Sequence, residues 1–296
     1  MVNLSNTEAA GHRSRPSSLA DLVRNMSYEV MPFKKTEQDV VDHVPTTVPL
    51  TVTVTEAKGI DATLGLTERL LGHGYQVAPH LPARLFVDDK HVADVVGRLG
   101  NAGVKSVFVV GGDTHTPTGR FTGAFDLLQA MQELGHPFQD VGIGGYPEGH
   151  GAIPQQAIEQ ALRLKAPLAS RVLTQICFDA STTSRWAADL VTAEIDLPVF
   201  VGIPGPVSRQ KLIRISAGIG LGQSARFLQK QQSLLWRFLL PGVYNPTKLA
   251  RQLGAAAPRT DNNISGLHIF TFNELRRTEL WRRELLASLA EREDRS

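Results

Sequence analysis

The sequence predicts a (β/α)8 barrel, a ring of eight parallel strands in which each strand is followed by a helix. Three observations favour this fold. The chain contains eight short β-rich runs bounded by turn residues, most of them are separated by segments with helical spacing, and several are apolar at consecutive positions. Consecutive apolar positions are typical of parallel strands that are covered on both faces. An open doubly wound sheet fits eight successive repeats less well.

The expected elements follow one another in a regular order. Strands are expected at 26–32, 49–55, 76–80, 105–111, 141–145, 171–178, 197–203 and 267–272. Helices are expected at 64–74, 91–102, 124–134, 154–165 and 184–193, and several of them end near glycine, as helices often do. The long connection between the seventh and eighth strands predicts extra helices at 223–240 and 245–253, and a last helix is expected at 273–291. Residues 1–20 are expected to form a flexible arm, and residues 21–296 a single barrel domain.

Composition and charge exclude several classes of protein. Apolar residues make up 42% of the chain and charged residues 20%, which is typical of a folded globular protein. The net charge of +2 comes from interspersed signs, so neither a nucleic acid nor a membrane is expected as a partner. The apolar runs are too short to span a membrane and residues 1–20 lack a signal-peptide core, so we expect a cytoplasmic protein. The single cysteine, Cys177, excludes an intrachain disulfide and a multi-thiolate zinc site.

Candidate site residues, most of them polar, gather where the expected strands end, which is the edge of a barrel that carries active sites. In chain order they are Glu29, Thr55 and Glu56, His80, Gly112 and Asp113, Tyr146 with Glu148 and His150, and Gln175 with Phe178. A carboxylate such as Glu29 is costly to place in a barrel strand without a purpose, and the amide of Gln175 needs polar partners there. Asp113 as a cap and Glu148 as a turn residue remain equally good interpretations.

Six short motifs carry a resemblance to a known family. They are Ser27-Tyr28-Glu29-Val30-Met31-Pro32, Ala78-Pro79-His80-Leu81, Gly112-Asp113, Gly145-Tyr146-Pro147-Glu148-Gly149-His150, Thr174-Gln175-Ile176-Cys177-Phe178-Asp179 and Val201-Gly202-Ile203. Their order resembles the methylenetetrahydrofolate reductase family over nearly the whole chain. The resemblance implies a barrel that reduces the methylene bridge of 5,10-methylenetetrahydrofolate to a 5-methyl group with a nicotinamide donor.

The resemblance also implies roles for individual residues. Glu29 matches the family's acid, which delivers a proton toward N10 so that the bridged ring opens to an iminium at N5. Asp113 and Gln175 match the positions that read the pterin, and Phe178 is expected beside the substrate. The expected cofactor-binding residues are Thr55, His80, Gly112, Tyr146 and His150.

The sequence departs from the family at the positions that hold FAD. Gly111 stands where most members have arginine, and Ala157, Gln160 and Leu164 align with three polar flavin-binding positions, although Lys165 could partly compensate. The loss of a cation near a pyrophosphate removes strong hydrogen bonds and puts FAD binding in doubt. The hypothesis is therefore direct hydride transfer from NADH, with NADPH also possible.

The second expected strand departs from the family as well, because Glu56 stands where flavin-containing members commonly have tyrosine. A second carboxylate near Glu29 would raise the proton affinity of one of the two, so Glu56 joins Glu29 as an expected catalytic residue. Asp113, which matches a pterin-reading position of the family, is the third expected catalytic residue. A solvated loop carboxylate beside Lys58 is the equally good alternative for Glu56.

Three alternatives stay open at this point. The first is a reductase of the same family that uses FAD in two steps. The second is a metal-dependent barrel hydrolase with His80, Asp113 and His150 as ligands, although no metal is expected because two of these histidines match family positions that need none. The third is a folate-binding barrel without catalysis. The sequence does not indicate an oligomeric state.

Overall fold

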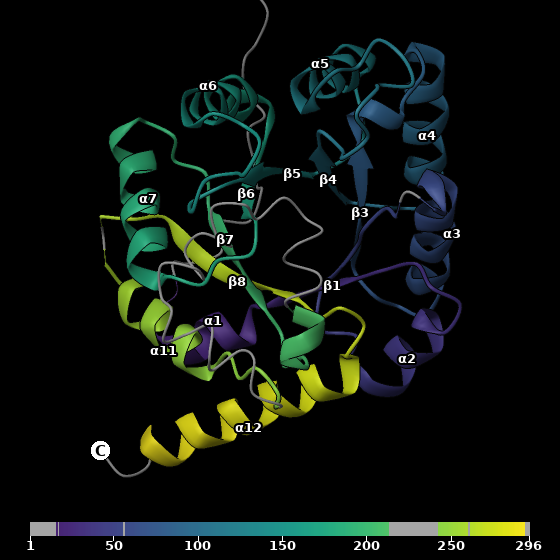
Figure 1. The fold of residues 1–296 in the computed structure, drawn as a ribbon. Coiled ribbons are helices and arrows are strands. Elements are labelled where there is room, and N and C mark those ends of the chain that lie inside the picture. The colour runs from purple at the N-terminus through teal and green to yellow at the C-terminus, as the bar shows by residue number, and fades with distance from the viewer. Residues whose placement is uncertain (1–15, 17, 56, 213–241, 260, 294–296) are drawn as a thin grey trace, which may run out of the picture.

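The computed structural model describes residues 16, 18–55, 57–212, 242–259 and 261–293. Within these residues, eight parallel strands pair in chain order and the last strand pairs with the first, so the sheet closes into a barrel. Helices surround the strands (Figure 1). The predicted (β/α)8 barrel is confirmed.

All eight expected strands are present, with shorter bounds in most cases. The strands are β1 (Ser27–Val30), β2 (Leu50–Val52), β3 (Val77–Pro82), β4 (Ser106–Val110), β5 (Asp140–Gly145), β6 (Arg171–Thr174), β7 (Val199–Pro204) and β8 (Ile264–Phe270).

The helices are α1 (Leu19–Arg24), α2 (Thr36–His43), α3 (Gly59–Gly72), α4 (Asp89–Asn101), α5 (Ala124–Leu134), α6 (Gln155–Lys165), α7 (Ala180–Thr192), α11 (Thr247–Ala256) and α12 (Leu275–Glu293), with 3-10 turns η1 (Ala83–Leu85) and η2 (Ala166–Leu168). The α11 helix lies between β7 and β8, as expected, whereas the helix expected at 223–240 falls outside the described residues. The α2 helix was not predicted because it is short and buries only Thr36 and Val40.

Three boundaries differ from the sequence prediction for identifiable reasons. The β6 strand ends at Thr174 and not at residue 178, because the Gln175 side-chain oxygen accepts the N–H of Ile176 at 2.9 Å and turns the chain out of the ladder. The β8 strand ends at Phe270 and not at 272, because Phe272 has a positive φ of 50°. The α1 helix begins at Leu19, so the last residues of the expected arm are helical.

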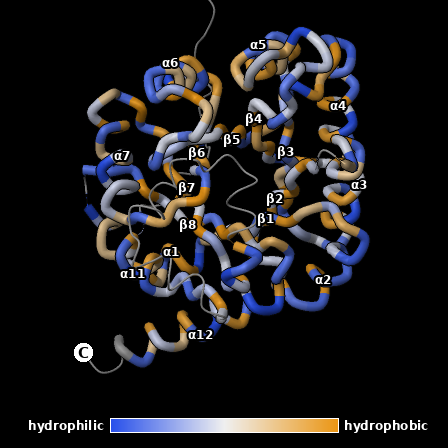
Figure 2. Tube along the Cα trace, viewed as in Figure 1, coloured by the Kyte–Doolittle hydropathy of each residue, from blue (hydrophilic) through white to orange (hydrophobic). Residues whose placement is uncertain are grey.

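Side chains alternate between the two faces of each strand, and the register decides which groups enter the barrel. On β1, Tyr28 and Val30 are fully buried under the surrounding helices. Ser27 and Glu29 therefore point into the barrel, opposite His268 and Phe270 of β8. The strands are largely hydrophobic in Figure 2, whereas the outer helices alternate between hydrophobic and hydrophilic residues. The polar groups of the interior thus stand out against an apolar frame.

The C-terminal helix holds β1 from outside through a buried carboxylate. The Tyr28 hydroxyl donates to Glu279 Oε2 at 2.9 Å, and Arg282 and Arg283 donate to the same carboxylate at 2.9 and 2.8 Å. Burial acts to raise the pKa of Glu279, but the hydrogen bonds from Arg282, Arg283 and Tyr28 outweigh burial and leave that pKa below its ordinary value of 4.5. The charged form of Glu279 therefore stabilises the fold.

A Glu279→Gln variant should lower the free energy of unfolding by about 2 kcal/mol at pH 7, because it removes the charge that three donors share. The lowered pKa means that this contribution is fully present above pH 4.5 and is lost as the pH falls through the folded-state pKa. Urea unfolding of both proteins from pH 7 downward measures the difference. Glu284→Gln, at an exposed position of the same helix, is the control and should change the stability by less than about 0.5 kcal/mol. A difference that does not shrink in acid would contradict the assignment.

Candidate active site

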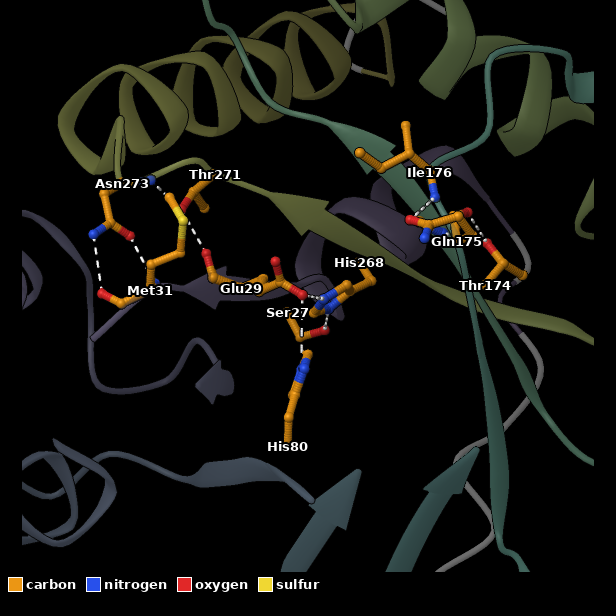
Figure 3. A network of polar contacts seen from close by, with 11 residues as sticks. Ser27, Glu29, Met31, His80, Thr174, Gln175, Ile176, His268, Thr271 and Asn273 are labelled. Atoms are coloured by element: carbon orange, nitrogen blue, oxygen red, sulfur yellow. Dashed lines mark hydrogen bonds and ion pairs between the residues drawn. The ribbon is translucent and has the colours of Figure 1, made fainter. Parts of the chain in front are cut away.

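Glu29 lies inside the mouth of the barrel, between two histidines. Its side chain is 15% exposed, with Oε2 at 3.7 Å from Nε2 of His80 on β3 and at 4.0 Å from Nε2 of His268 on β8. Figure 3 shows both rings directed at the Glu29 carboxyl group. Neither Nε2 atom has a hydrogen-bond partner within the described residues. Three strands that are distant in sequence therefore converge on one carboxyl group.

The two histidine rings beside Glu29 are uncharged near neutral pH. Burial is the main cause that lowers the pKa of His80 to about 4 and the pKa of His268 to about 3, and the Arg171 guanidinium contributes to both values in the same direction. The Glu29 charge acts to raise the pKa of His80, but burial outweighs it. Burial raises the pKa of Glu29, with His80 acting in the opposite direction. Although both separations fall within ion-pair distance, the imidazoles are neutral, so these contacts join neutral rings to a carboxyl group. Glu29 is thus a buried acid that holds its proton more tightly than an ordinary glutamate.

The backbone of Glu29 is fixed by residues that follow β8. The Thr271 hydroxyl donates to the Glu29 carbonyl at 2.5 Å. The Asn273 side chain accepts from the Met31 N–H at 2.9 Å and donates to the Met31 carbonyl at 3.1 Å (Figure 3). Asn273 has a positive φ of 60°, a conformation that asparagine tolerates better than most residues. These bonds hold the carboxyl group at one place in the mouth.

Gln175 and Phe178 lie on the opposite side of the mouth. The Gln175 N–H donates to the Gly145 carbonyl at 2.8 Å, so Gln175 is still hydrogen-bonded to β5 although it follows the last residue of β6. Its side chain lies on the β6 side of the barrel, across from Glu29 in Figure 3. Phe178 is half-buried and meets the Tyr244 ring edge-on at 6.5 Å. A planar molecule in the mouth would therefore meet an amide and an aromatic surface on this side.

The corner at residues 144–151 combines binding-type and structural residues. Tyr146 and His150 meet edge-on at 5.4 Å, and burial, followed by the nearby charge of Asp113, raises the pKa of Tyr146. Asp113 itself is exposed. Glu148 has a structural task, because its Oε1 accepts from the N–H groups of Phe178 and Asp179 at 2.6 and 2.8 Å, where α7 begins. The structure thus brings Tyr146 and His150 into contact, and the charge of Asp113 is near enough to act on Tyr146.

The two glycines that end β5 differ in the space around them. A Cβ atom at Gly144 would meet nothing closer than the Tyr146 hydroxyl at 3.9 Å. A Cβ atom at Gly145 would lie 2.7 Å from both Trp186 and Val172, on the outer face of β5. Close packing against α7 and β6 therefore requires a glycine at position 145.

The remaining expected site residues lie at the rim. Gly112 has a φ of 92°, and a Cβ atom there would come within 3.1 Å of Pro82. The backbone carbonyl of Thr55 accepts from the N–H groups of Lys58 and Gly59 at 3.0 Å and closes the turn after β2. Glu56 lies outside the described residues, so its expected catalytic role stays a prediction.

Sequence reasoning missed His268 and Ser27. His268 is completely buried in β8, and its Nδ1 lies 2.8 Å from the Ser27 hydroxyl. The argument that identified Gln175, a polar side chain that needs partners inside a barrel, applies equally to His268. Lys165 is buried as well, donates to the Gly144 carbonyl at 3.3 Å, and has a pKa lowered to about 8 by burial.

The described residues contain no group of three or more histidine, cysteine, aspartate or glutamate side chains placed to hold a metal ion. His80 points inward beside Glu29, whereas His150 lies at the rim and bonds the N–H of Ala152 through Nδ1 at 3.2 Å. In the same part of the chain, no helix combines the length and apolar character that crossing a membrane requires.

The closed ring of parallel strands makes this protein a (β/α)8 barrel, and the buried Glu29 carboxyl group at its mouth is a candidate proton donor. A family model described as methylenetetrahydrofolate reductase matches residues 17–221. The chain belongs to the methylenetetrahydrofolate reductase family, as the sequence motifs predicted.

Individual relatives agree with the family assignment. The chain is 27% identical over 202 residues to the 5,10-methylenetetrahydrofolate reductase of Escherichia coli (strain K12) and 28% identical over 205 residues to that of Salmonella typhimurium (strain LT2). Each alignment covers 63% of this chain and 66% of the relative. A protein of Burkholderia cenocepacia J2315 assigned as a phosphonomutase has a similar fold, with a TM-score of 0.50, 14% identity and coverage of 93% of this chain and 96% of that one.

The two glycines of the corner should respond differently to the same substitution. Gly145→Ala forces a methyl group against Trp186 and Val172 and should lower the free energy of unfolding by about 1 to 3 kcal/mol. Gly144→Ala enters open space and should leave stability within about 0.5 kcal/mol of the wild type. Thermal and urea unfolding of the two variants measure the contrast. Equal stability of both would contradict the placement of Trp186.

Proposed function

We propose that this protein reduces 5,10-methylenetetrahydrofolate to 5-methyltetrahydrofolate, with Glu29 as the acid and a hydride that passes directly from NADH. The observation that carries the proposal is the buried Glu29 carboxyl group, whose pKa burial raises, at the mouth of a barrel of this family. Proton delivery by a positioned acid contributes about 10²- to 10⁴-fold to a rate. An acid has to be protonated before it acts, and the environment of Glu29 favours that state.

Glu29 would give its proton toward N10 of the bridged ring, which opens to an electrophilic iminium at N5. Because His80 and His268 are neutral, they do not compete as proton donors near pH 7. The exposed Asp113 carboxylate and the Gln175 amide are suited to the amide-like edge of a pterin, which presents both donors and acceptors. Phe178 would lie against the same planar molecule. These residues position the substrate with its bridge toward Glu29.

The nicotinamide supplies the hydride, and the protein contributes placement and exclusion of water. Gly144 leaves open space at the mouth, and Tyr146 and His150 lie beside it. We assign this corner, with Thr55 and Gly112 at the rim, to the nicotinamide and its ribose. His80 was expected to contact the cofactor, but its burial against Glu29 favours a role as a partner of the acid.

The described residues do not fit FAD well. Ala157, Gln160 and Leu164 lie on one exposed face of α6, which offers an apolar and neutral row where the family presents polar anchors. Gly111 brings no cation to the end of β4, and the Lys165 ammonium group is buried against the Gly144 carbonyl. A pyrophosphate needs charge-assisted donors, which this face lacks. No step of the proposed reaction therefore passes through a flavin.

A Glu29→Gln variant should keep its affinity for NADH and lose at least about 100-fold in turnover, because an amide has no acidic proton to deliver. NADH oxidation after addition of methylenetetrahydrofolate measures the rate, and NADH fluorescence titration measures binding. The wild-type rate should fall as the pH rises through a pKa above the ordinary value of 4.5. Glu284→Gln is the matched control at an exposed site and should behave as the wild type. Near-wild-type turnover of Glu29→Gln would remove Glu29 from the acid role.

Protein purified without added flavin should show no flavin absorption and should still oxidise NADH when methylenetetrahydrofolate is added. The physical reason is the neutral, partly apolar face of α6. An absorption spectrum together with the same assay, with and without FAD, makes the measurement. Stoichiometric flavin, or activity only with added FAD, would favour the two-step reaction while leaving the substrate assignment in place.

A further inference from the structure

Below Glu29, two residues outside the expected site form a hydrogen-bonded pair inside the barrel. The Ser27 hydroxyl lies 2.8 Å from His268 Nδ1, and the opposite ring nitrogen, Nε2, faces Glu29 Oε2 at 4.0 Å. Figure 3 shows the three side chains in sequence, with the His268 ring between Ser27 and Glu29. His268 lies beyond residues 17–221, which the family model matches. The ring can therefore transmit the influence of Ser27 to the carboxyl group.

The position of the hydrogen on the neutral His268 ring decides whether Nε2 offers Glu29 a hydrogen-bond donor or an acceptor. If Nε2 carries the hydrogen, it can donate to Glu29 both as a carboxylic acid and as a carboxylate, since each has an oxygen that accepts. If Nε2 carries a lone pair, it can accept from the acid but repels the carboxylate. An acid that gives up its proton in each turnover passes through both states, so only the Nε2–H form suits the full cycle.

The surroundings of Ser27 favour that form. His268 Nδ1 is the hydrogen-bond partner of the Ser27 hydroxyl among the described residues. Ser27 also lines a cavity of about 70 Å³ at the N-terminal end of the barrel, together with Thr51, Asp140 and Arg171. Water in a polar cavity of this size can donate to the Ser27 oxygen and leave the hydroxyl hydrogen for Nδ1. Thr51 Oγ1, which is buried without a partner in the described part of the chain, offers such water a second contact.

We propose that Ser27 and His268 are positioning residues, in which the Ser27 hydroxyl fixes His268 as the Nε2–H form and Nε2–H stabilises Glu29 after it has released its proton. The catalytic consequence rests on the function proposed above. Two histidines face Glu29, His80 from β3 and His268 from β8, and Arg171 of β6 adds a positive charge close to both rings. The hydrogen bond to Ser27 distinguishes His268 from His80. Separations of this kind often shorten when substrate closes a site.

Two substitutions of His268 distinguish the effect of its N–H donor from the effect of the volume that its ring fills. Glutamine can place a side-chain N–H group where the histidine Nε2–H lies, whereas leucine fills a similar volume without a donor. His268→Leu should raise the titration midpoint of Glu29 by about one pH unit, because the carboxylate loses a buried donor, and His268→Gln should leave the midpoint near the wild-type value. Infrared absorption of the carboxylic acid group, identified by its loss in Glu29→Gln, measures the midpoint without any substrate.

Turnover provides the second measurement. His268→Leu should lower kcat about tenfold and change KM for methylenetetrahydrofolate less than about twofold, and His268→Gln should recover most of the rate. Ser27→Ala, the mildest change, should shift the Glu29 midpoint in the same direction as His268→Leu. Ser265→Ala, whose hydroxyl bonds the Asn263 carbonyl at 3.1 Å elsewhere on β8, is the matched control and should leave both quantities unchanged.

The outcomes are distinguishable. An unchanged or lowered midpoint in His268→Leu overturns the proposal, since a lowered midpoint means that Nε2 accepts from the acid. Equal effects of leucine and glutamine also overturn it, because shape and not the donor would then matter. A raised midpoint in His268→Leu with a wild-type midpoint in His268→Gln supports the positioning role even if methylenetetrahydrofolate is not turned over, in which case the proposed function alone fails.

Discussion

The seam between β8 and β1 is the constraint on which the candidate site depends. Ser27 and Glu29 point into the barrel opposite His268 and Phe270 only because the first and last strands pair in this register. The same seam places Thr271 on the Glu29 carbonyl. From outside, the Tyr28–Glu279 hydrogen bond ties β1 to the C-terminal helix. Closure therefore converts residues at opposite ends of the chain into one rigid environment for a carboxyl group.

Within that environment, burial decides the chemistry of Glu29. A cation beside a buried carboxylate would favour the charged form and lower its pKa. The two closest rings carry no charge near neutrality, because burial lowers the pKa of His80 to about 4 and that of His268 to about 3. The barrel thus surrounds its acid with groups that can hydrogen-bond to it without neutralising it. The same balance distinguishes Glu29 from Glu279, whose bonds to Arg282 and Arg283 keep it charged.

Local patterns predicted the strands, most helices and an inward-facing Glu29, whereas tertiary closure determined the rest. Glu29 and Gln175 were identifiable because a polar side chain in an apolar strand needs a reason. The partnership of Ser27 with His268 depends on which strands become neighbours and in which register, information that no short window contains. The end of β6 was missed because the Gln175 side chain competes with the ladder for the Ile176 N–H.

The corner at residues 144–151 divides into parts with different freedom to change. Glu148 accepts hydrogen bonds at the start of α7, and Gly145 packs against the Trp186 ring, so these two residues hold the barrel together at this point. Gly144, Tyr146 and His150 border the open side instead. Redesign of the mouth for a different ligand can therefore vary the second set while the barrel keeps its shape. Residues 144–151 therefore combine positions that the fold requires with positions that can be substituted.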